Sequence, residues 1–207
     1  MLQGFDETAN PAQGAPRLAA LRARMQAEGL AGFIVPRADA HQGEYVAPRD
    51  ERLSWLTGFT GSAGFAVILQ DAAGVFVDGR YRVQVRAQVD LAHYTPVDWP
   101  EVLPGPWLRD HLTTGDVGFD PWLHTADEIA RLEAALEGTQ IRLRPSANLV
   151  DAIWPDQPAP RKAAPSHTRT IWPAKAAPPS APGWPKACAP AGSPPRSSPC
   201  PTASAGC

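Results

Sequence analysis

The 207-residue sequence predicts an α/β domain with a mixed sheet of about six strands flanked by helices. Segments with helical apolar spacing alternate with short apolar runs about six times between residues 15 and 157. One neighbouring pair of these runs is joined by a tight turn, which predicts an antiparallel hairpin inside the alternating pattern. No internal repeat is visible, and the length suits one domain with a core of its own.

The first elements are a helix and a buried strand. Residues 17–29 (RLAALRARMQAEG) carry Leu18, Leu21 and Met25 at helical spacing, and Gly29 supplies the stop signal. The run GLAGFIVP is typical of a short buried strand. The polar stretch RADAHQGEYVAP then predicts a loop, and RDERLSWLTG predicts a short helix with its two leucines on the inner face.

The hairpin lies in residues 64–79. GFAVILQ and GVFVDG are rich in β-branched and aromatic residues and are joined by DAAG, a suitable turn. RYRVQVRAQVD follows as a predicted helix, although its valines leave a strand open. HYTPV predicts a further strand.

The last third of the domain alternates again. PGPWLRDHL predicts a helix with prolines suited to its first turn, and DVGFDP predicts a strand. TADEIARLEAALEG predicts a strong helix, because Thr125 can cap it, acidic residues fill its first turn and Gly138 follows its end. TQIRLRP predicts the last strand, and SANLVDAIW predicts a short helical turn.

Two compositions share this chain. Residues 1–157 contain every Asp and Glu and no Lys or Cys, whereas residues 158–207 contain all three Lys, all three Cys and more than half of the prolines. The spacing of the cysteines matches no zinc site. The segment around them also lacks the apolar residues of a core that disulfides could stabilise. We therefore predict an N-terminal extension at 1–14, one domain at 15–157 and a disordered Pro/Ala-rich tail beyond it.

The charge balance limits the classes of partner. The formal net charge is −2, so nothing indicates nucleic acid or an anionic membrane. No apolar run approaches the roughly 20 residues of a membrane span. The N-terminus lacks the basic-then-apolar design of a signal peptide, so we expect a cytoplasmic protein.

The glycine-rich stretch GFTGSAG invites a nucleotide-binding interpretation that its spacing does not support. The glycines follow G-x-x-G-x-x-G, no Walker lysine follows, and the stretch precedes a strand. Ser62 does not lie in a G-x-S-x-G elbow, which argues against a nucleophile. We expect Gly58, Gly61 and Gly64 to allow a tight loop and a close backbone approach.

The loop DAHQGEY places Asp39, His41 and Glu44 close together in the sequence. Metal sites use these residue types, but the spacing matches no metal motif. A hydrogen-bonding loop and a substrate-cleft lining are the two better interpretations of His41.

The turn VDGRY is the second candidate site. A predicted strand ends before Asp78, and ligand groups gather at strand ends in open α/β folds. Arg80 could bind a carboxylate or a carbonyl through its planar guanidinium. The alternative is that Arg80 pairs with Asp78 or Asp39 and only fixes the turn.

Several of these motifs together resemble one family. ADAHQGEYVAPRDERLSWLTGFTGSAGFAVI, FVDGRYRVQVRAQVD, VGFDP and NLVDAIW are similar, in order and spacing, to the N-terminal domain of the cytosolic, three-domain type of Xaa-Pro aminopeptidase (aminopeptidase P). The resemblance covers roughly residues 15–160.

The resemblance implies a creatinase-type α/β module that is not catalytic. In the family a similar second domain follows, and then a C-terminal domain that binds two metal ions, usually manganese, through two Asp, one His and two Glu. A metal-bridging water attacks the peptide bond before a proline in the second position, and the enzymes are commonly dimers. The resemblance also implies that Arg80 reaches the substrate cleft and, more weakly, that His41 faces it.

The sequence departs from the family because no set of five metal ligands can be found in it. After Asp156 there is no carboxylate side chain, so metal chemistry cannot be built there. We expect no catalytic residue, metal or cofactor in this chain and no peptidase activity from it alone. A stand-alone binding or dimerisation module remains the alternative, and an independent α/β enzyme that uses the His41 loop is a third hypothesis.

The tail at 158–207 has a sharper interpretation than a linker. High Ala, Pro, Arg and Gly with new Cys is what GC-rich DNA encodes out of frame. Back-translation with GC-rich codons, read in a shifted frame, can give an amphipathic helix and a buried strand that resemble the start of the family's second domain. We therefore expect an out-of-frame remnant of that domain, from a frameshift near residues 160–163, which the nucleotide sequence would test.

Overall fold

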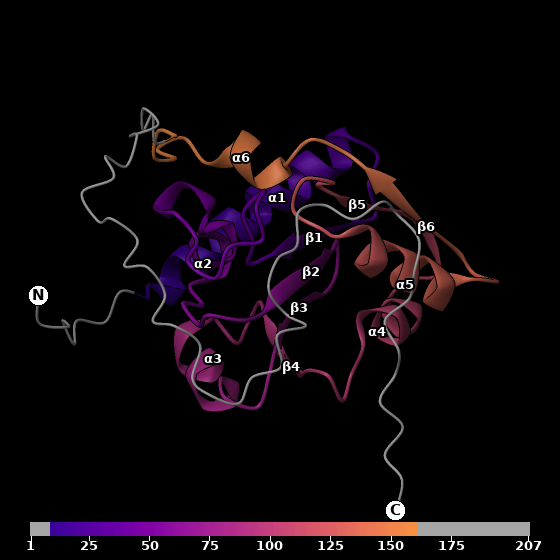
Figure 1. The fold of residues 1–207 in the computed structure, drawn as a ribbon, viewed down its shortest axis with the longest axis horizontal. Helices are drawn as coiled ribbons and strands as arrows, with labels where there is room; N and C mark the ends of the chain where they lie inside the picture. Colours follow the sequence, from indigo (N-terminus) through magenta and orange to yellow (C-terminus); the bar gives the residue numbers. More distant parts are fainter. Residues whose placement is uncertain (1–8, 161–207) are drawn as a thin grey trace, which may run out of the picture. The chain divides into compact units, whose positions relative to one another are not determined.

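The computed structural model describes residues 9–160, which form a six-stranded sheet with helices on both faces (Figure 1). The strands are β1 Gly32–Pro36, β2 Phe65–Leu69, β3 Ala73–Val77, β4 Thr95–Asp98, β5 Thr114–Phe119 and β6 Gln140–Pro145. The helices are α1 Gly14–Ala27, α2 Arg52–Thr57, α3 Arg82–Gln88, α4 Pro104–His111, α5 Ala126–Leu136 and α6 Leu149–Ile153, with 3₁₀ turns η1 Pro11–Gln13 and η2 Pro48–Asp50. The predicted α/β class with a mixed sheet is confirmed.

The sheet has the strand order β4-β3-β2-β1-β5-β6. β2 is antiparallel to both β1 and β3, and β2 and β3 form the predicted hairpin. The β1–β5, β3–β4 and β5–β6 pairs are parallel. Phe33 of β1 lies opposite Ile68 on one side and Gly118 on the other. β1 therefore has an antiparallel neighbour on one edge and a parallel neighbour on the other.

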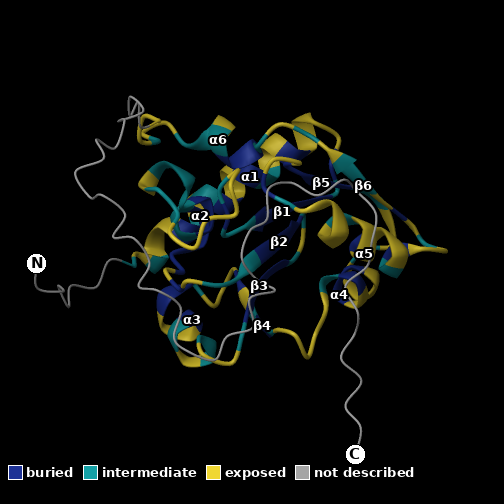
Figure 2. Ribbon diagram, viewed as in Figure 1, coloured by how far each residue is buried: buried dark blue, intermediate teal, exposed yellow. Residues whose placement is uncertain are grey.

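Alternating side chains of the central strands build two hydrophobic cores on opposite faces of the sheet. Phe33 and Val35 belong to the core closed by α1, α2, α3 and α6, whereas Ile34 belongs to the core closed by α4 and α5. Figure 2 shows the central strands as the buried middle of the domain. Burial on both faces explains why these strands are continuous apolar runs.

The segment at 80–90, for which the sequence left two options, is the helix α3. Val83 is 85% exposed, whereas Val85 is fully buried at 0%. In a strand, residues two apart would share a face, so only a helix separates these two valines. Gln88, three residues after Val85, is buried with it, as helical spacing requires.

Two elements begin earlier than the sequence predicts. α1 begins at Gly14, because Pro16 is tolerated in the first turn of a helix and Gly14 lies against the ring of Tyr94. β5 begins at Thr114, where its pairing with β6 starts at Gln140. The cap predicted for α5 is confirmed: Thr125 and Glu128 form a reciprocal capping box.

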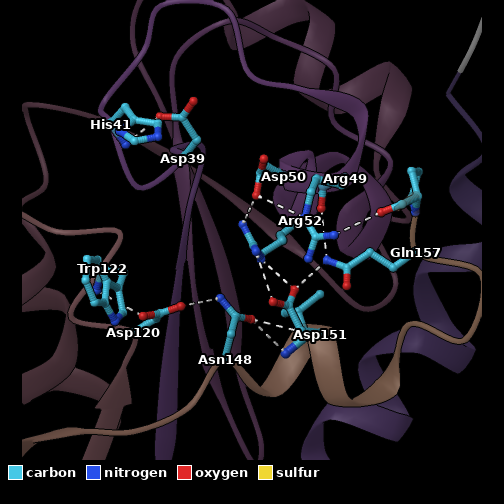
Figure 3. Close-up of polar contacts among 12 residues, drawn as sticks. Asp39, His41, Arg49, Asp50, Arg52, Asp120, Trp122, Asn148, Asp151 and Gln157 are labelled. Atoms are coloured by element: carbon cyan, nitrogen blue, oxygen red, sulfur yellow. Dashed lines mark hydrogen bonds and ion pairs between the residues drawn. The ribbon is translucent and has the colours of Figure 1, made fainter. Parts of the chain in front are cut away.

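Arg52, whose side chain is buried, joins α2 to α6 through an ion pair with the half-buried Asp151 (Figure 3). Its Nε donates to Oδ1 of Asp151 at 2.6 Å and its Nη2 donates to Oδ2 at 3.0 Å. Its Nη1 donates to Oδ1 of Asp50 at 3.0 Å. The amide nitrogen of Gln157 donates to Oδ1 of Asp151 and to the carbonyl of Arg49. These contacts fix the last described helix to the rest of the domain.

Some expectations fall beyond these residues. The predicted disordered tail and its out-of-frame origin concern residues that lie almost wholly outside 9–160, and the three predicted segment boundaries stay predictions. Among the helices of residues 9–160, none is both long enough and apolar enough to cross a membrane.

Replacing Arg52 with Met is expected to lower the free energy of unfolding by about 3 kcal/mol, because two carboxylates lose a cation that is only 6% exposed. Urea unfolding of the 207-residue chain measures this change. Arg142→Met is the control, since Arg142 is exposed and has no ion pair among the described residues, and it should change stability by at most about 0.5 kcal/mol. Equal stability of the two variants would contradict this role of Arg52.

Candidate functional site

A cleft of about 660 Å³ lies at the carboxyl ends of β1, β4 and β5. Its lining includes Ile34 and Pro36 in the second half of β1 and continues into the segments after β4 and β5. Residues of α4 and α5 complete it. Open α/β sheets bind ligands at the carboxyl ends of their strands, beside the strand at which the chain connections change direction. β1 is such a strand here, because its neighbour β2 is antiparallel to it and its neighbour β5 is parallel.

The loop after β1 is held in shape by Asp39 (Figure 3). Its Oδ1 accepts hydrogen bonds from the backbone N–H groups of His41 and Gly43, each at 2.9 Å. The bond from Gly43 is the main reason why the pKa of Asp39 lies below its usual range. Gln42 adopts a left-handed φ of 54°, and its side chain donates to the carbonyl of Leu123 at 3.0 Å. The loop is thereby tied to the segment after β5.

His41 itself is exposed and does not line the cleft, although the next two residues do. Its backbone, rather than its ring, takes part in the loop. In residues 9–160 no three His, Cys, Asp or Glu side chains come together as a possible metal site. The manganese centre that the resemblance implies belongs to a separate C-terminal domain of the family, and the Asp39 carboxylate serves the loop backbone.

The turn after β3 holds Arg80 against Asp78. Nε of Arg80 donates to Oδ1 of Asp78 at 3.1 Å, and Nη2 donates to Oδ2 at 2.7 Å. The backbone N–H of Arg80 adds a bond to Oδ1 at 2.9 Å. Of the two partners that the sequence offered, the structure selects Asp78. The guanidinium bonds hold the pKa of the Asp78 carboxyl below its usual range.

Arg80 nevertheless remains available to a ligand. Its side chain is 66% exposed, and Nη1 has no hydrogen bond in the part of the chain that the structure describes. It does not line the cleft, but the hydroxyl of the adjacent Tyr81 hydrogen-bonds to Ser62, which does. The structure thus brings the Arg80 turn to the edge of the cleft without placing Arg80 inside it.

The glycines of GFTGSAG have the structural role that the sequence predicts. Gly58 ends α2 with a left-handed φ of 86°, and a Cβ there would lie 2.5 Å from the carbonyl of Gln88. At Gly61 a Cβ would lie 2.2 Å from the ring of Phe59. Both positions require glycine because the chain passes so close to its neighbours.

Two other motifs, VGFDP and NLVDAIW, meet at the end of β5. Asp120 of VGFDP accepts a hydrogen bond from Nδ2 of Asn148 at 3.0 Å and one from the backbone N–H of Trp122 at 3.0 Å (Figure 3). Oδ1 of Asn148 caps α6 by accepting from the N–H groups of Val150 and Asp151. These motif residues therefore support the loop after β5.

Sequence reasoning singled out Glu44, which does line the cleft, but missed the other two polar groups, His124 and Arg131. The side chain of His124 is 9% exposed, and its buried Nε2 has no hydrogen-bond partner among the described residues. Burial lowers the pKa of His124, which favours the neutral ring. Arg131 and Glu44 also line the cleft. A usable signal existed for α5, where Glu128, Arg131 and other lining residues recur at helical spacing.

The fold and the site place this chain in the class of mixed-sheet α/β domains with a cleft at the ends of their strands. The model of the family described as "Creatinase/Prolidase N-terminal domain" matches residues 17–153. The chain belongs to this family. The predicted resemblance to the N-terminal domain of Xaa-Pro aminopeptidases is confirmed by the relatives.

Curated relatives match over the same part of the chain. Xaa-Pro aminopeptidase 2 of Homo sapiens is 40% identical over 148 residues, which cover 69% of this chain and 22% of the relative. Xaa-Pro aminopeptidase ApepP of Drosophila melanogaster is 40% identical over 135 residues, covering 63% of this chain and 22% of the relative. The chain thus spans under a quarter of the length of these relatives.

Solved structures agree on the fold. The X-prolyl aminopeptidase of Caenorhabditis elegans, described as a cytosolic enzyme with a di-nuclear active site, matches with a TM-score of 0.65 and 29% identity, over 70% of this chain and 26% of that one. The N-terminal domain of the cytoplasmic peptidase PepQ from Mycobacterium tuberculosis matches with a TM-score of 0.53 and 25% identity, over 67% of this chain and 98% of that one.

Replacing Arg80 with Gln is expected to raise the pKa of Asp78 toward its ordinary value, because the guanidinium bonds are lost. The folded-state pKa of Asp78 is depressed, so the pair stabilises the fold above the unfolded-state pKa, and this stabilisation is lost as the pH falls through the folded-state pKa. The stability difference between wild type and Arg80→Gln should therefore be largest near neutral pH and vanish in strong acid.

Carbon-13 NMR of the Asp78 carboxyl and urea unfolding at several pH values measure these two effects. Arg86→Gln is the control, since Arg86 is exposed and has no ion pair among the described residues. An unchanged Asp78 titration in Arg80→Gln would contradict the pairing.

Proposed function

We propose that this chain supplies the non-catalytic N-terminal domain of a Xaa-Pro aminopeptidase, an enzyme that releases the residue before a proline. The family match and the relatives support this proposal. The matched region is 22% of the human relative, and we place the activity in the parts of the relatives that this chain does not match, as the resemblance implies. The chemistry that the resemblance assigns to those parts is manganese-dependent hydrolysis, and the di-nuclear site in the name of the Caenorhabditis elegans enzyme supports two metal ions.

The observation that carries the proposal is the pre-organised turn at Arg80. One edge of the guanidinium is fixed by Asp78, while Nη1 has no hydrogen bond among the described residues. A fixed cation of this kind can donate to a peptide carbonyl or carboxylate without first losing side-chain freedom. We assign Arg80, after β3, and His41, on the exposed loop after β1, to substrate binding.

The partners follow from the same proposal. The substrate is a peptide with proline in its second position, and the full-length protein is a cytoplasmic homodimer. The cytosolic description of the structural neighbour supports the location. The alternative of a stand-alone binding module draws on the 660 Å³ cleft, which this domain builds from its own residues.

A domain exchange tests the proposal. Residues 9–160 replace the matched domain of the Caenorhabditis elegans enzyme, and hydrolysis of a Xaa-Pro peptide is measured with manganese present. We expect an active chimera, in which Arg80→Gln raises KM about tenfold because one charge-assisted hydrogen bond is lost. The 207-residue chain alone should release no N-terminal residue, with or without manganese.

Arg86→Gln in the same chimera is the matched control, since Arg86 is exposed like Arg80 and lies only six residues after it. Activity of the 207-residue chain alone would overturn the non-catalytic assignment. Equal KM values for the two chimeric variants would overturn the role of Arg80.

A further inference from the structure

We propose that the 660 Å³ cleft binds a small zwitterion with a large apolar side chain, the chemistry shared by an apolar amino acid and a short apolar peptide with free ends. This site goes beyond the proposed function, because it is built within residues 9–160 and needs no catalytic domain.

The size and the lining of the cleft suit an apolar ligand body. Its volume falls within the range of about 300–1,000 Å³ that is typical of small-molecule sites. Ile34, Phe65 and Leu132 contribute apolar surface, and Trp99 and Leu103, which are 37% and 49% exposed, add an open apolar rim. Covering such surface is favourable for an apolar side chain.

Two groups of the cleft suit a carboxylate. Nε2 of His124 is buried and has no hydrogen-bond partner among the described residues, so in the tautomer that carries the proton on Nε2 a ligand oxygen that accepts a hydrogen bond would satisfy it. Arg131, which is on α5 and three residues after Glu128, has no ion pair in residues 9–160 and can neutralise the same carboxylate.

One group of the cleft suits an ammonium. Glu44 is exposed, and its carboxylate has no ion pair in the described part of the chain. The other charged lining groups are already engaged: Arg37 donates to the Glu44 carbonyl and lies 3.8 Å from Glu51, and Glu128 belongs to the capping box of α5. The charges left for a ligand are therefore one guanidinium and one carboxylate, which is the pattern that a zwitterion matches.

The same contacts argue against a phosphate at the start of α5. The Thr125 hydroxyl already accepts from the N–H of Glu128, and the Glu128 carboxylate already accepts from the N–H of Thr125. An added dianion would also lie near the Glu128 carboxylate, which is 3.9 Å from Nδ1 of His124, and this repulsion is larger for two negative charges than for the single charge of a carboxylate, which Arg131 can balance.

Calorimetric titration of the 207-residue chain with defined probes tests the proposal. The probes are L-phenylalanine, L-phenylalanyl-L-leucine, and the N-acetylated and C-amidated forms of each. We expect saturable binding of at least one free-ended probe with Kd near or below about 1 mM. Each end-blocked form of that probe should bind about tenfold more weakly, because one ionic contact is lost. Binding of L-phenylalanine or of L-phenylalanyl-L-leucine shows whether the ligand of the cleft is an amino acid or a short peptide.

Two charge-neutral variants test the two ends separately. Arg131→Gln should weaken the free acid about tenfold and leave the C-amidated probe unchanged, whereas Glu44→Gln should weaken the free amine and leave the N-acetylated probe unchanged. Arg142→Gln, on β6, is the control and should change nothing. Both substituted side chains are exposed, so unchanged melting temperatures are expected and are checked first.

The proposal is overturned if no free-ended probe binds, if blocked and free probes bind equally, or if Arg131→Gln and Glu44→Gln match the control. Because the probes contain no proline and no hydrolysis is measured, these outcomes are distinct from a failure of the Xaa-Pro aminopeptidase assignment.

Discussion

The pairing of β1 with two neighbours of opposite direction is the constraint on which the rest of this domain depends. Gly32–Pro36 pairs antiparallel with β2 over its whole length and parallel with β5 at Gly32 and Phe33. Its alternate side chains enter both hydrophobic cores, so each helical layer packs against it. Gly32 permits this, because a Cβ there would lie 2.7 Å from Leu69. A strand that is buried on both faces and paired on both edges cannot be displaced without disturbing every layer.

The same constraint produces the candidate site. Because β2 runs against β1, the loop before β2 lies at the end of β1, where the backbone N–H of Arg37 donates to the carbonyl of Gly64 at 3.1 Å. Because β5 runs with β1, the segment with Leu123 and His124 leaves the sheet at that end too. Loops that are distant in sequence therefore meet at one cleft, and the rigid strands hold their positions.

Local pattern accounts for what the sequence could predict. Apolar periodicity gives the strands and helices, and short spacing gives both the capping box and the Arg80–Asp78 pair. Of the cleft group, only Glu44 stands in a stretch that local pattern singled out; its grouping with His124 and Arg131 could not be found in this way, because the sheet order, rather than any motif, brings residue 44 to residue 124. The contact of Arg52 with Asp151 could not be predicted from local pattern either, since 99 residues separate the two in the sequence.

Native-state hydrogen exchange of the 207-residue chain tests the central role of β1 most directly. The backbone amides of Phe33 to Val35 should exchange only through global unfolding, with the same free energy as urea unfolding. Amides of the edge strands β4 and β6 should exchange through smaller openings of lower free energy. Exchange of the β1 amides at or below the free energy of the edge strands would contradict the account.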